Sequence, residues 1–301
     1  MERKGRIAAV GVTALIASNS FGSMILTALA RPQVGLVAQC NLVTWNPATK
    51  MESLVQASAF LSQAKRFEVL IPTPTIPTVK EVGDSSIDFA SNLITPPRAS
   101  RPITPPNPDD ELDPSFGVLI RGKAEVKQVT FVGNLKATTI KGSDVVALSD
   151  WMAKNGYKAS AAQNQWLEKY VAKRWYFTSI QINSDSDTLR TRGVRLSFKT
   201  EVPVVPYTSP KNSWVQNLRQ EVFFVSPAHL QGTIGGKSLW TGRLMGHAFL
   251  TKKATPEFAK DLGLFASDVA DQSWVSRYVD VSAPETATDD LYFLKIPRRT
   301  K

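Results

Sequence analysis

The stretch from Ser143 to Tyr207 constrains the fold most, because its apolar residues recur first with a helical period and then with the period of a strand. Ser143 is a favourable N-cap residue, and Leu148 and Met152 then fall on one helical face. Gly156 is the kind of residue that commonly ends a helix. The spacing therefore predicts a first amphipathic helix between Ser143 and Gly156.

A second amphipathic helix is predicted directly after the first. Ser160 can serve as its N-cap, and Ala162, Trp166 and Tyr170 form an apolar stripe at helical spacing. Charged residues such as Glu168 lie on the opposite face of this helix. The two helices are therefore expected to pack side by side, with their apolar stripes turned towards a sheet.

Two strands follow this helical pair. From Trp175 to Ile182, and again from Val194 to Phe198, aromatic and β-branched residues recur at spacing two, and the sequence between them is polar. Short strands also dominate the rest of the chain, whereas helical patterns are few. We therefore predict an α+β fold, a mainly antiparallel sheet with the helical pair on one face.

The remaining elements are predicted from the same patterns. Strands are expected at 55–60, 67–71, 118–120, 125–132, 135–140, 219–225, 239–250 (with an irregularity at Gly242 or Gly246), 274–282 and 289–297, and a helix capped by Thr255 at 255–262. Pro72, Pro74 and Pro77 predict an extended edge segment, because proline donates no ladder hydrogen bond. Seven prolines between residues 95 and 114 predict a surface loop.

The N-terminus carries Arg3, Lys4 and Arg6, followed by an uncharged run from Ile7 to Ala30. That run is long enough for a membrane-spanning helix, and it also ends in small residues of the kind that precede a signal-peptide cut. We favour an uncleaved hydrophobic helix, so that residues 1–40 form a signal anchor and linker. Residues 41–301 then form one extracytoplasmic domain, with the N-terminus in the cytoplasm.

Charge and cysteine content limit the classes of partner and site. The net charge of +10 favours anionic partners, and an anionic lipid surface is one of them. Nucleic acid is disfavoured, because the charge is dispersed and no nucleic-acid-binding motif is present. Cys40 is the single cysteine, which excludes an intramolecular disulfide and any multi-thiolate metal site. A lipid anchor on Cys40 is the alternative use of this thiol.

Candidate chemistry is sparse. His229 and His247 are the only histidines, and a structural role is expected for each, because no nucleophile motif accompanies them. The acidic residues at 109–113, and Asp185 with Asp187, lack a spaced partner. The segment 232–238 resembles a phosphate-binding loop but is one residue too short, so it predicts a glycine-rich turn. We assign no residue to catalysis, to a cofactor or to a metal.

One family resemblance rests on several short motifs. They are FEVLIPTP at 67–74 followed by Pro77, ALSDW at 147–151 with NGY at 155–157, YV at 170–171, WYF at 175–177, and VRLSF at 194–198 followed by Pro203 and Pro206. Over roughly residues 60 to 210 the chain resembles a family of exported bacterial proteins catalogued as domain of unknown function 2330. The resemblance implies export and a mainly β domain, and it implies no catalytic residue.

Two functions remain open at this point. The first is a non-catalytic accessory subunit that is anchored in the membrane and stabilises a larger membrane protein assembly, for example an energy-converting one. Its support is the basic exported domain, the proline-rich segments and four tryptophans outside the helical pair, which are Trp45, Trp214, Trp240 and Trp274. The alternative is an extracytoplasmic hydrolase that uses His229 or His247 with nearby carboxylates.

Overall fold

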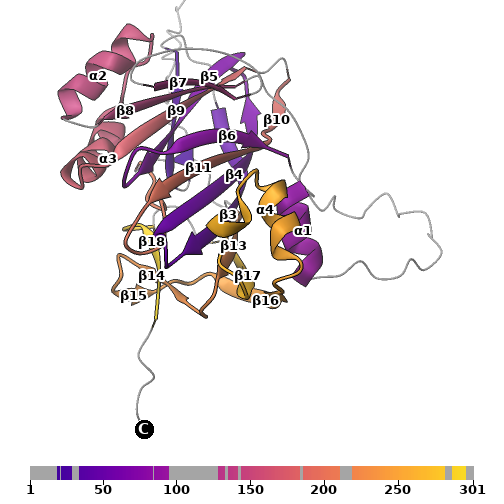
Figure 1. Ribbon diagram of the computed structural model, residues 1–301. Coiled ribbons are helices and arrows are strands. Elements are labelled where there is room, and N and C mark those ends of the chain that lie inside the picture. The colour runs from indigo at the N-terminus through magenta and orange to yellow at the C-terminus, as the bar shows by residue number, and fades with distance from the viewer. Residues whose placement is uncertain are drawn as a thin grey trace, which may run out of the picture.

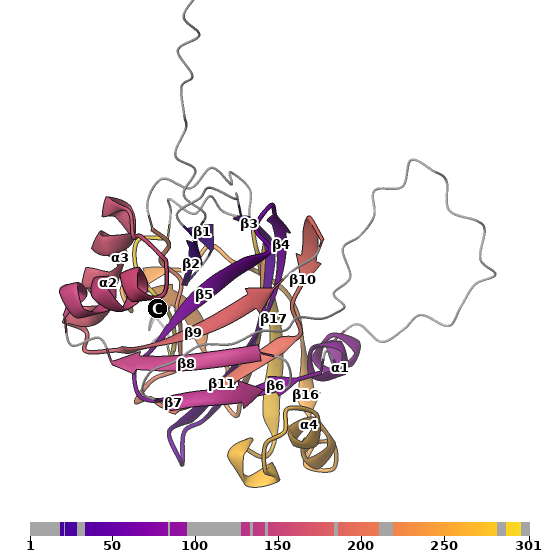
Figure 2. The ribbon, with the colours of Figure 1, turned by 90° about the horizontal axis from the view of Figure 1, so that it is seen from above.

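The computed structural model describes residues 19–20, 22–28, 34–83, 85–94, 128–132, 135–141, 144–183, 186–210, 219–281 and 287–295. Two β-sheets lie face to face, and helices pack against the outer side of each sheet (Figures 1 and 2). Most strand pairs are antiparallel. The predicted α+β class, with β-structure in the majority and a helical pair on one face, is therefore confirmed.

The first sheet has six strands in the order β1-β2-β5-β9-β8-β7, all antiparallel to their neighbours. Its strands are β1 (Asn19–Ser20), β2 (Ser23–Thr27), β5 (Arg66–Thr73), β7 (Gln128–Val132), β8 (Leu135–Lys141) and β9 (Tyr176–Asn183). On its inner face Val69 and Ile180 are cross-strand partners, and both point towards the second sheet.

The second sheet has eight strands in the order β16-β17-β13-β3-β4-β11-β6, with β10 pairing β4 off this path. Its strands are β3 (Val34–Asn46), β4 (Met51–Ser62), β6 (Thr78–Val82), β10 (Thr188–Arg190), β11 (Gly193–Lys199), β13 (Arg219–Ser226), β16 (Arg243–Leu250) and β17 (Ser273–Asp280). Strands β3 and β13 are parallel, and every other pair is antiparallel.

A small third sheet, in the order β12-β18-β14-β15, lies beside the larger two (Figure 1). Its strands are β12 (Val204–Val205), β14 (Gln231–Ile234), β15 (Ser238–Leu239) and β18 (Leu291–Leu294). The turn between β14 and β15 places Gly235 and Gly236 at φ +60 and +71, values that favour glycine. The predicted glycine-rich turn is therefore confirmed.

The helical pair forms as its capping residues predict. Helix α3 (Ala161–Ala172) begins with a capping box between Ser160 and Gln163. Helix α2 (Val145–Lys154) differs in one respect, because its N-cap is Asp144, whose carboxylate accepts a 2.6 Å hydrogen bond from the Ala147 amide. The predicted cap, Ser143, lies outside the described residues.

Buried aromatic side chains join this pair to the six-stranded sheet. Trp166 and Tyr170 of α3 are buried, and their rings lie 4.8 Å apart. Both rings contact Phe177 of β9, with centroids 6.1 and 6.2 Å from its ring. The apolar stripe predicted from the sequence is therefore the surface that packs on the sheet.

Helices α1 (Ser85–Ile94) and α4 (Thr255–Asp261) cover the outer face of the eight-stranded sheet (Figure 1). The α4 side chain Phe258 is fully buried and contacts Phe89 of α1, with ring centroids 5.4 Å apart. The α4 N-cap is Ala254 rather than the predicted Thr255, whose hydroxyl donates to the Thr251 carbonyl. Helix α1 was not predicted from the sequence.

The described part of the uncharged N-terminal run does not form the predicted helix. Its residues form β1 and β2, and Met24, Ile25 and Leu26 are buried at the side of β5. The Gln163 side chain donates a 3.0 Å hydrogen bond to the Ile25 carbonyl. The predicted span from Ile7 to Ala30 is therefore wrong in its second half. That half lacks charged residues because its side chains lie in the protein core.

Residues 7–18, 21 and 29–30 of this run lie outside the described residues. Within the described part of the chain, none of the helices combines the length and the apolar character that crossing a bilayer requires. Strand β3 places Cys40 between Ala57 and Glu221, and burial raises the pKa of its thiol. The sheets thus begin upstream of the boundary expected at residue 40, and Cys40 lies in the middle of a strand.

Other predictions have mixed outcomes. The two strands predicted around the polar loop exist as β9 and β11, but they belong to different sheets, so the loop crosses between layers. The irregularity predicted in 239–250 is confirmed as a register shift between Leu244 and Gly246. The predicted proline-rich loop at 95–114 and the predicted strand at 118–120 lie outside the described residues.

Candidate functional site

The most unusual surface of the described chain is the outer edge of strand β16. Strand β17 pairs one side of β16, and no described strand pairs the other (Figure 1). Three large apolar side chains on this strand are exposed, Leu244 at 49%, Met245 at 52% and Phe249 at 41%. A long, apolar and unpaired edge is a template for another strand.

Neighbouring segments extend this apolar area. Leu239 lies four positions before β16, and Val281 directly follows β17, whose Val279 pairs with Arg243 at the start of β16. Both Leu239 and Val281 are more than half exposed. We call the set the β16 surface; its members are Leu239, Leu244, Met245, Phe249 and Val281.

An aromatic cluster centred on Trp274 borders the β16 surface. Trp274 of β17 is half-buried, and the Phe249 ring lies 5.1 Å from it in an edge-to-face arrangement. The rings of His229 and His247 lie 4.3 and 5.5 Å from Trp274 and 5.6 Å from each other. Three segments that are distant in sequence thus meet at one exposed aromatic cluster.

The structure brings the two histidines together, which the sequence did not predict. His229 lies between β13 and β14, and His247 lies on β16; both are exposed. Neither imidazole makes a hydrogen bond or ion pair with another described residue. A structural role was expected for each histidine; in the structure each exposed ring packs against Trp274. Nothing local signals their contact, because it depends on the pairing of both β13 and β16 with β17.

A buried polar network fixes the turn that leads into β16. Asp280 is buried and accepts hydrogen bonds from the Tyr207 hydroxyl and, at 2.8 Å, from Trp240 Nε1. Burial, together with the hydrogen bond to Asp280, raises the pKa of Tyr207. The Trp240 ring fills the space beside Gly242, where a Cβ would lie 2.4 Å from a ring carbon. The β16 surface is thus attached to a rigid base.

A second network links the third sheet to helix α3. Asp290 is fully buried and accepts from the Tyr170 hydroxyl at 2.6 Å, from the Tyr207 amide at 3.1 Å and from Lys173 at 2.7 Å. Burial alone would lower the pKa of Lys173. The charge of Asp290 and the hydrogen bonds to Asp290 and Asp289 outweigh burial, so the pKa of Lys173 is raised. Every polar group in this network has a partner, which indicates a structural role.

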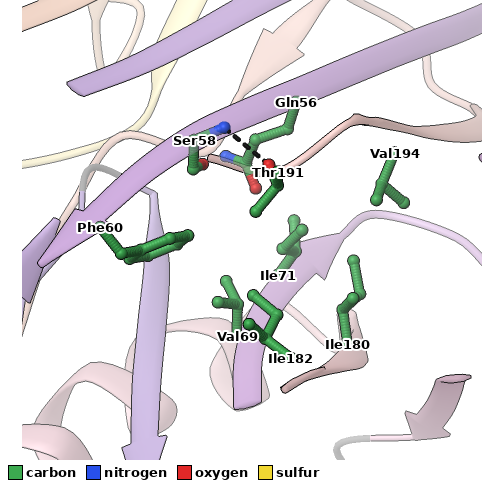
Figure 3. A pocket seen from close by; sticks show the side chains of 9 residues that line it. All are labelled: Gln56, Ser58, Phe60, Val69, Ile71, Ile180, Ile182, Thr191 and Val194. Carbon is green, nitrogen blue, oxygen red and sulfur yellow. Dashed lines mark hydrogen bonds between the residues drawn. The ribbon is translucent and has the colours of Figure 1, made fainter. Parts of the chain in front are cut away.

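A small pocket lies between the two large sheets (Figure 3). Val69, Ile71, Ile180 and Ile182 of the six-stranded sheet form its apolar lower side. The opposite side is mixed and is formed by Gln56, Ser58 and Phe60 of β4 with Thr191 and Val194. Thr191 Oγ1 accepts a 2.8 Å hydrogen bond from the Ser58 amide. The pocket offers about 20 Å³ to the centre of a water molecule, enough for about one water. It is too small for an organic substrate.

Few of the candidate residues from the sequence gather at one place. Asp187 lies in an exposed bend, and Asp185 and the acidic residues at 109–113 lie outside the described residues. Trp240 is buried, Trp45 packs at the margin of the core and Trp214 is not described. Of the three described tryptophans in this set, Trp274 is the one that borders the β16 surface. The described residues contain no cluster of three His, Cys, Asp or Glu side chains suited to a metal.

Comparison with known proteins yields a family match. The profile of a family described as an uncharacterized protein conserved in bacteria, domain of unknown function 2330, matches residues 22–219. None of the curated proteins matches the chain. A solved structure titled crystal structure of baculovirus P35 is similar, with 8% sequence identity and a TM-score of 0.38, over 72% of this chain and 75% of that one. The β16 surface lies beyond the residues that the family profile matches.

Proposed function

This chain belongs to the bacterial family catalogued as domain of unknown function 2330, and we propose that it serves as an exported, non-catalytic accessory subunit. In this role it binds a larger membrane protein assembly, for example an energy-converting one, on the extracytoplasmic side. The observation that carries the proposal is the β16 surface, where large apolar side chains border an unpaired strand edge.

The geometry supports recognition by strand addition. A partner segment in extended conformation can pair with the open backbone of β16, while the apolar side chains on both faces give specificity. Trp274 and Phe249 supply the aromatic contact area that is typical of interface hot spots. The base formed by Asp280 and Trp240 keeps this edge preorganised, which reduces the entropy lost on binding.

The charge pattern indicates an acidic partner segment. Arg243 stands at the start of β16, and Lys252 and Lys253 follow its end, so exposed cations flank both ends of the strand. The Lys252 ammonium forms an ion pair with Asp271 at 3.4 Å. The whole chain carries a net charge of +10. Complementary charge speeds association and suppresses unsuitable partners.

Export is proposed from the segment upstream of β1. Three cations precede an uncharged run from Ile7 to Ser18, whose length is typical of the apolar region of a signal peptide, about 7–15 residues. Strand β2 belongs to the buried core, so a cut after Ala30 would remove it. We expect N-terminal sequencing of the native protein to find a start at or before Asn19; a start at Arg31 would contradict the proposal.

The binding test uses the full chain, captured from gently solubilised membranes of a host that encodes it. We expect one partner in stoichiometric amount with the native chain, and little of it with Leu244→Asp. The matched control is Thr78→Asp, which adds the same charge to β6, the opposite edge of the same sheet. Equal recovery with both variants would overturn the β16 surface as the interface.

Two further readouts separate this proposal from the alternatives. Anionic vesicles containing phosphatidylglycerol test the lipid-surface alternative, in which the chain binds vesicles and no stoichiometric protein partner is found. A hydrolase would lose its activity in His229→Ala or His247→Ala. Such a loss, with a chain that remains monomeric and without a partner, would replace the accessory-subunit proposal.

A further inference from the structure

We propose that His229 and His247 together form a binding site for a divalent transition metal ion that prefers imidazole ligands, Zn²⁺ or Cu²⁺. The inference does not rest on the proposed function. It rests on the contact between the only two histidines of the chain at one exposed place.

The spacing of the two rings suits a shared ion. A Zn–N bond of about 2.0–2.1 Å places the ion roughly 3.2 Å from the centre of an imidazole ring. Two rings on one tetrahedral ion then have centroids about 5 Å apart. The centroids of His229 and His247 are 5.6 Å apart, close to the spacing that a shared ion requires.

The ring nitrogens are available for a ligand. Both imidazoles are exposed, and within the described part of the chain neither forms a hydrogen bond or an ion pair. What positions them is ring contact, since His229 lies over Trp274 with an interplanar angle of 35° and His247 meets the same ring nearly edge-on at 73°. These ring contacts orient both imidazoles without a hydrogen bond to another described residue.

The donor set decides which ions fit. Neutral imidazole suits Zn²⁺ and Cu²⁺, whereas Ca²⁺ and Mg²⁺ require oxygen ligands. Cu²⁺ is expected to bind more tightly than Zn²⁺, because affinities for a given nitrogen site follow that order. With two protein ligands, the remaining coordination positions hold water and stay open at the surface.

The first experiment is a Zn²⁺ titration of the full chain without a polyhistidine tag, followed by NMR of ¹⁵N-labelled imidazoles. Because the chain has only two histidines, each ring gives its own signals. We expect both rings to shift together, along one binding curve, with no response to Mg²⁺. If only one ring shifts, or if the two rings follow different curves, the shared site is refuted.

The second experiment uses Cu²⁺ quenching of tryptophan fluorescence. We expect His229→Gln and His247→Gln each to weaken binding about tenfold or more, since each removes one of two ligands. In Trp274→Phe the quenching amplitude should fall while the NMR-detected Zn²⁺ affinity is retained. Thermal unfolding checks that these three substitutions leave the fold intact. Native affinity in both histidine variants would overturn the proposal.

Discussion

Strands β6 and β16 are the two edges of the same eight-stranded sheet, and they differ in length, in charge and in exposed apolar side chains. Strand β6 is short, follows Pro77 and carries Lys80 and Glu81; Glu81 pairs with Arg192 at 2.9 Å. Strand β7 of the other sheet also lies beside it (Figure 2). Strand β16 is longer and exposes apolar side chains, with Arg243 at its first position as its one formally charged residue.

This difference shows which edge of the sheet is protected against pairing with another strand. Charged residues, proline and short length are the usual means by which proteins prevent unwanted strand pairing, and β6 uses all three. Strand β16 has one charged residue, Arg243, at its first position, and a register shift between Leu244 and Gly246 that leaves its second half regular. One edge is therefore protected against pairing and the other is available for it.

The largest expected effect concerns the base of the β16 edge. Asp280→Ala removes the acceptor of the buried Tyr207 hydroxyl and of Trp240 Nε1, so we expect a loss of about 3 kcal/mol in the free energy of unfolding. Urea denaturation measures it. Asp280→Asn keeps one acceptor oxygen and should lose less. A loss below about 1 kcal/mol in the alanine variant would show that the edge does not depend on this network.

The next prediction compares the loss of the Phe249 ring with a change of charge at the β16 edge. Phe249→Asp and Phe249→Lys both remove an exposed aromatic ring, but only the aspartate repels an acidic partner. We expect the aspartate variant to weaken partner binding by about 2 kcal/mol, roughly 30-fold, and the lysine variant by less. Co-purification at graded salt compares them. If the lysine variant binds more weakly, the partner segment is not acidic.

A smaller effect is expected in the middle of the same sheet. Burial raises the pKa of Glu52 on β4, and the hydrogen bond from the Val204 amide opposes this only in part. The folded state therefore retains a proton that the unfolded chain releases, so stability falls as pH rises above the ordinary carboxyl range. Glu52→Gln should lack this loss and gain about 1 kcal/mol at pH 7.

Urea denaturation between pH 4 and pH 8 measures this difference. The two proteins should converge at low pH, and partner binding should be unchanged, because Glu52 lies away from both edges. A variant that is less stable than the native chain at pH 7 would mean that Glu52 is charged in the folded state.

The smallest effect is expected at the protected edge. Glu81→Ala removes the pair with Arg192, whose side chain is nearly half exposed, and such pairs contribute about 0.5 kcal/mol or less. Thermal unfolding should shift little, and partner recovery should match the native chain. If this variant disturbs binding as much as a β16 variant does, the contrast between the edges is wrong.

The sequence predicted those parts of the fold whose signals are local. Ser160 and Gly156 mark helix boundaries directly, and the alternation from Trp175 onwards marks a strand. The second half of the N-terminal run was misassigned because a continuous apolar sequence looks alike in a lipid bilayer and in a doubly covered strand. Only the pairing of β2 with β5 distinguishes them.

The candidate site could not be predicted for a related reason. The aromatic cluster joins His229, His247 and Trp274, which come from three different segments. Their contact follows from the pairing of β13 and β16 with β17, and no short-range pattern encodes those registers. The buried Asp280 is similar, because its partners Tyr207 and Trp240 lie far from it in sequence.

The parallel pairing of β3 with β13 also affects how the chain acquires its fold. Strand β3 lies near the N-terminus, and its neighbour on one side comes from the last third of the chain. During synthesis or translocation β3 therefore has an unpaired side until most of the protein has emerged. Pairings between such distant segments form slowly. We infer that the nascent chain depends on holding factors until β13 arrives, and that truncation before Arg219 leaves an aggregation-prone sheet.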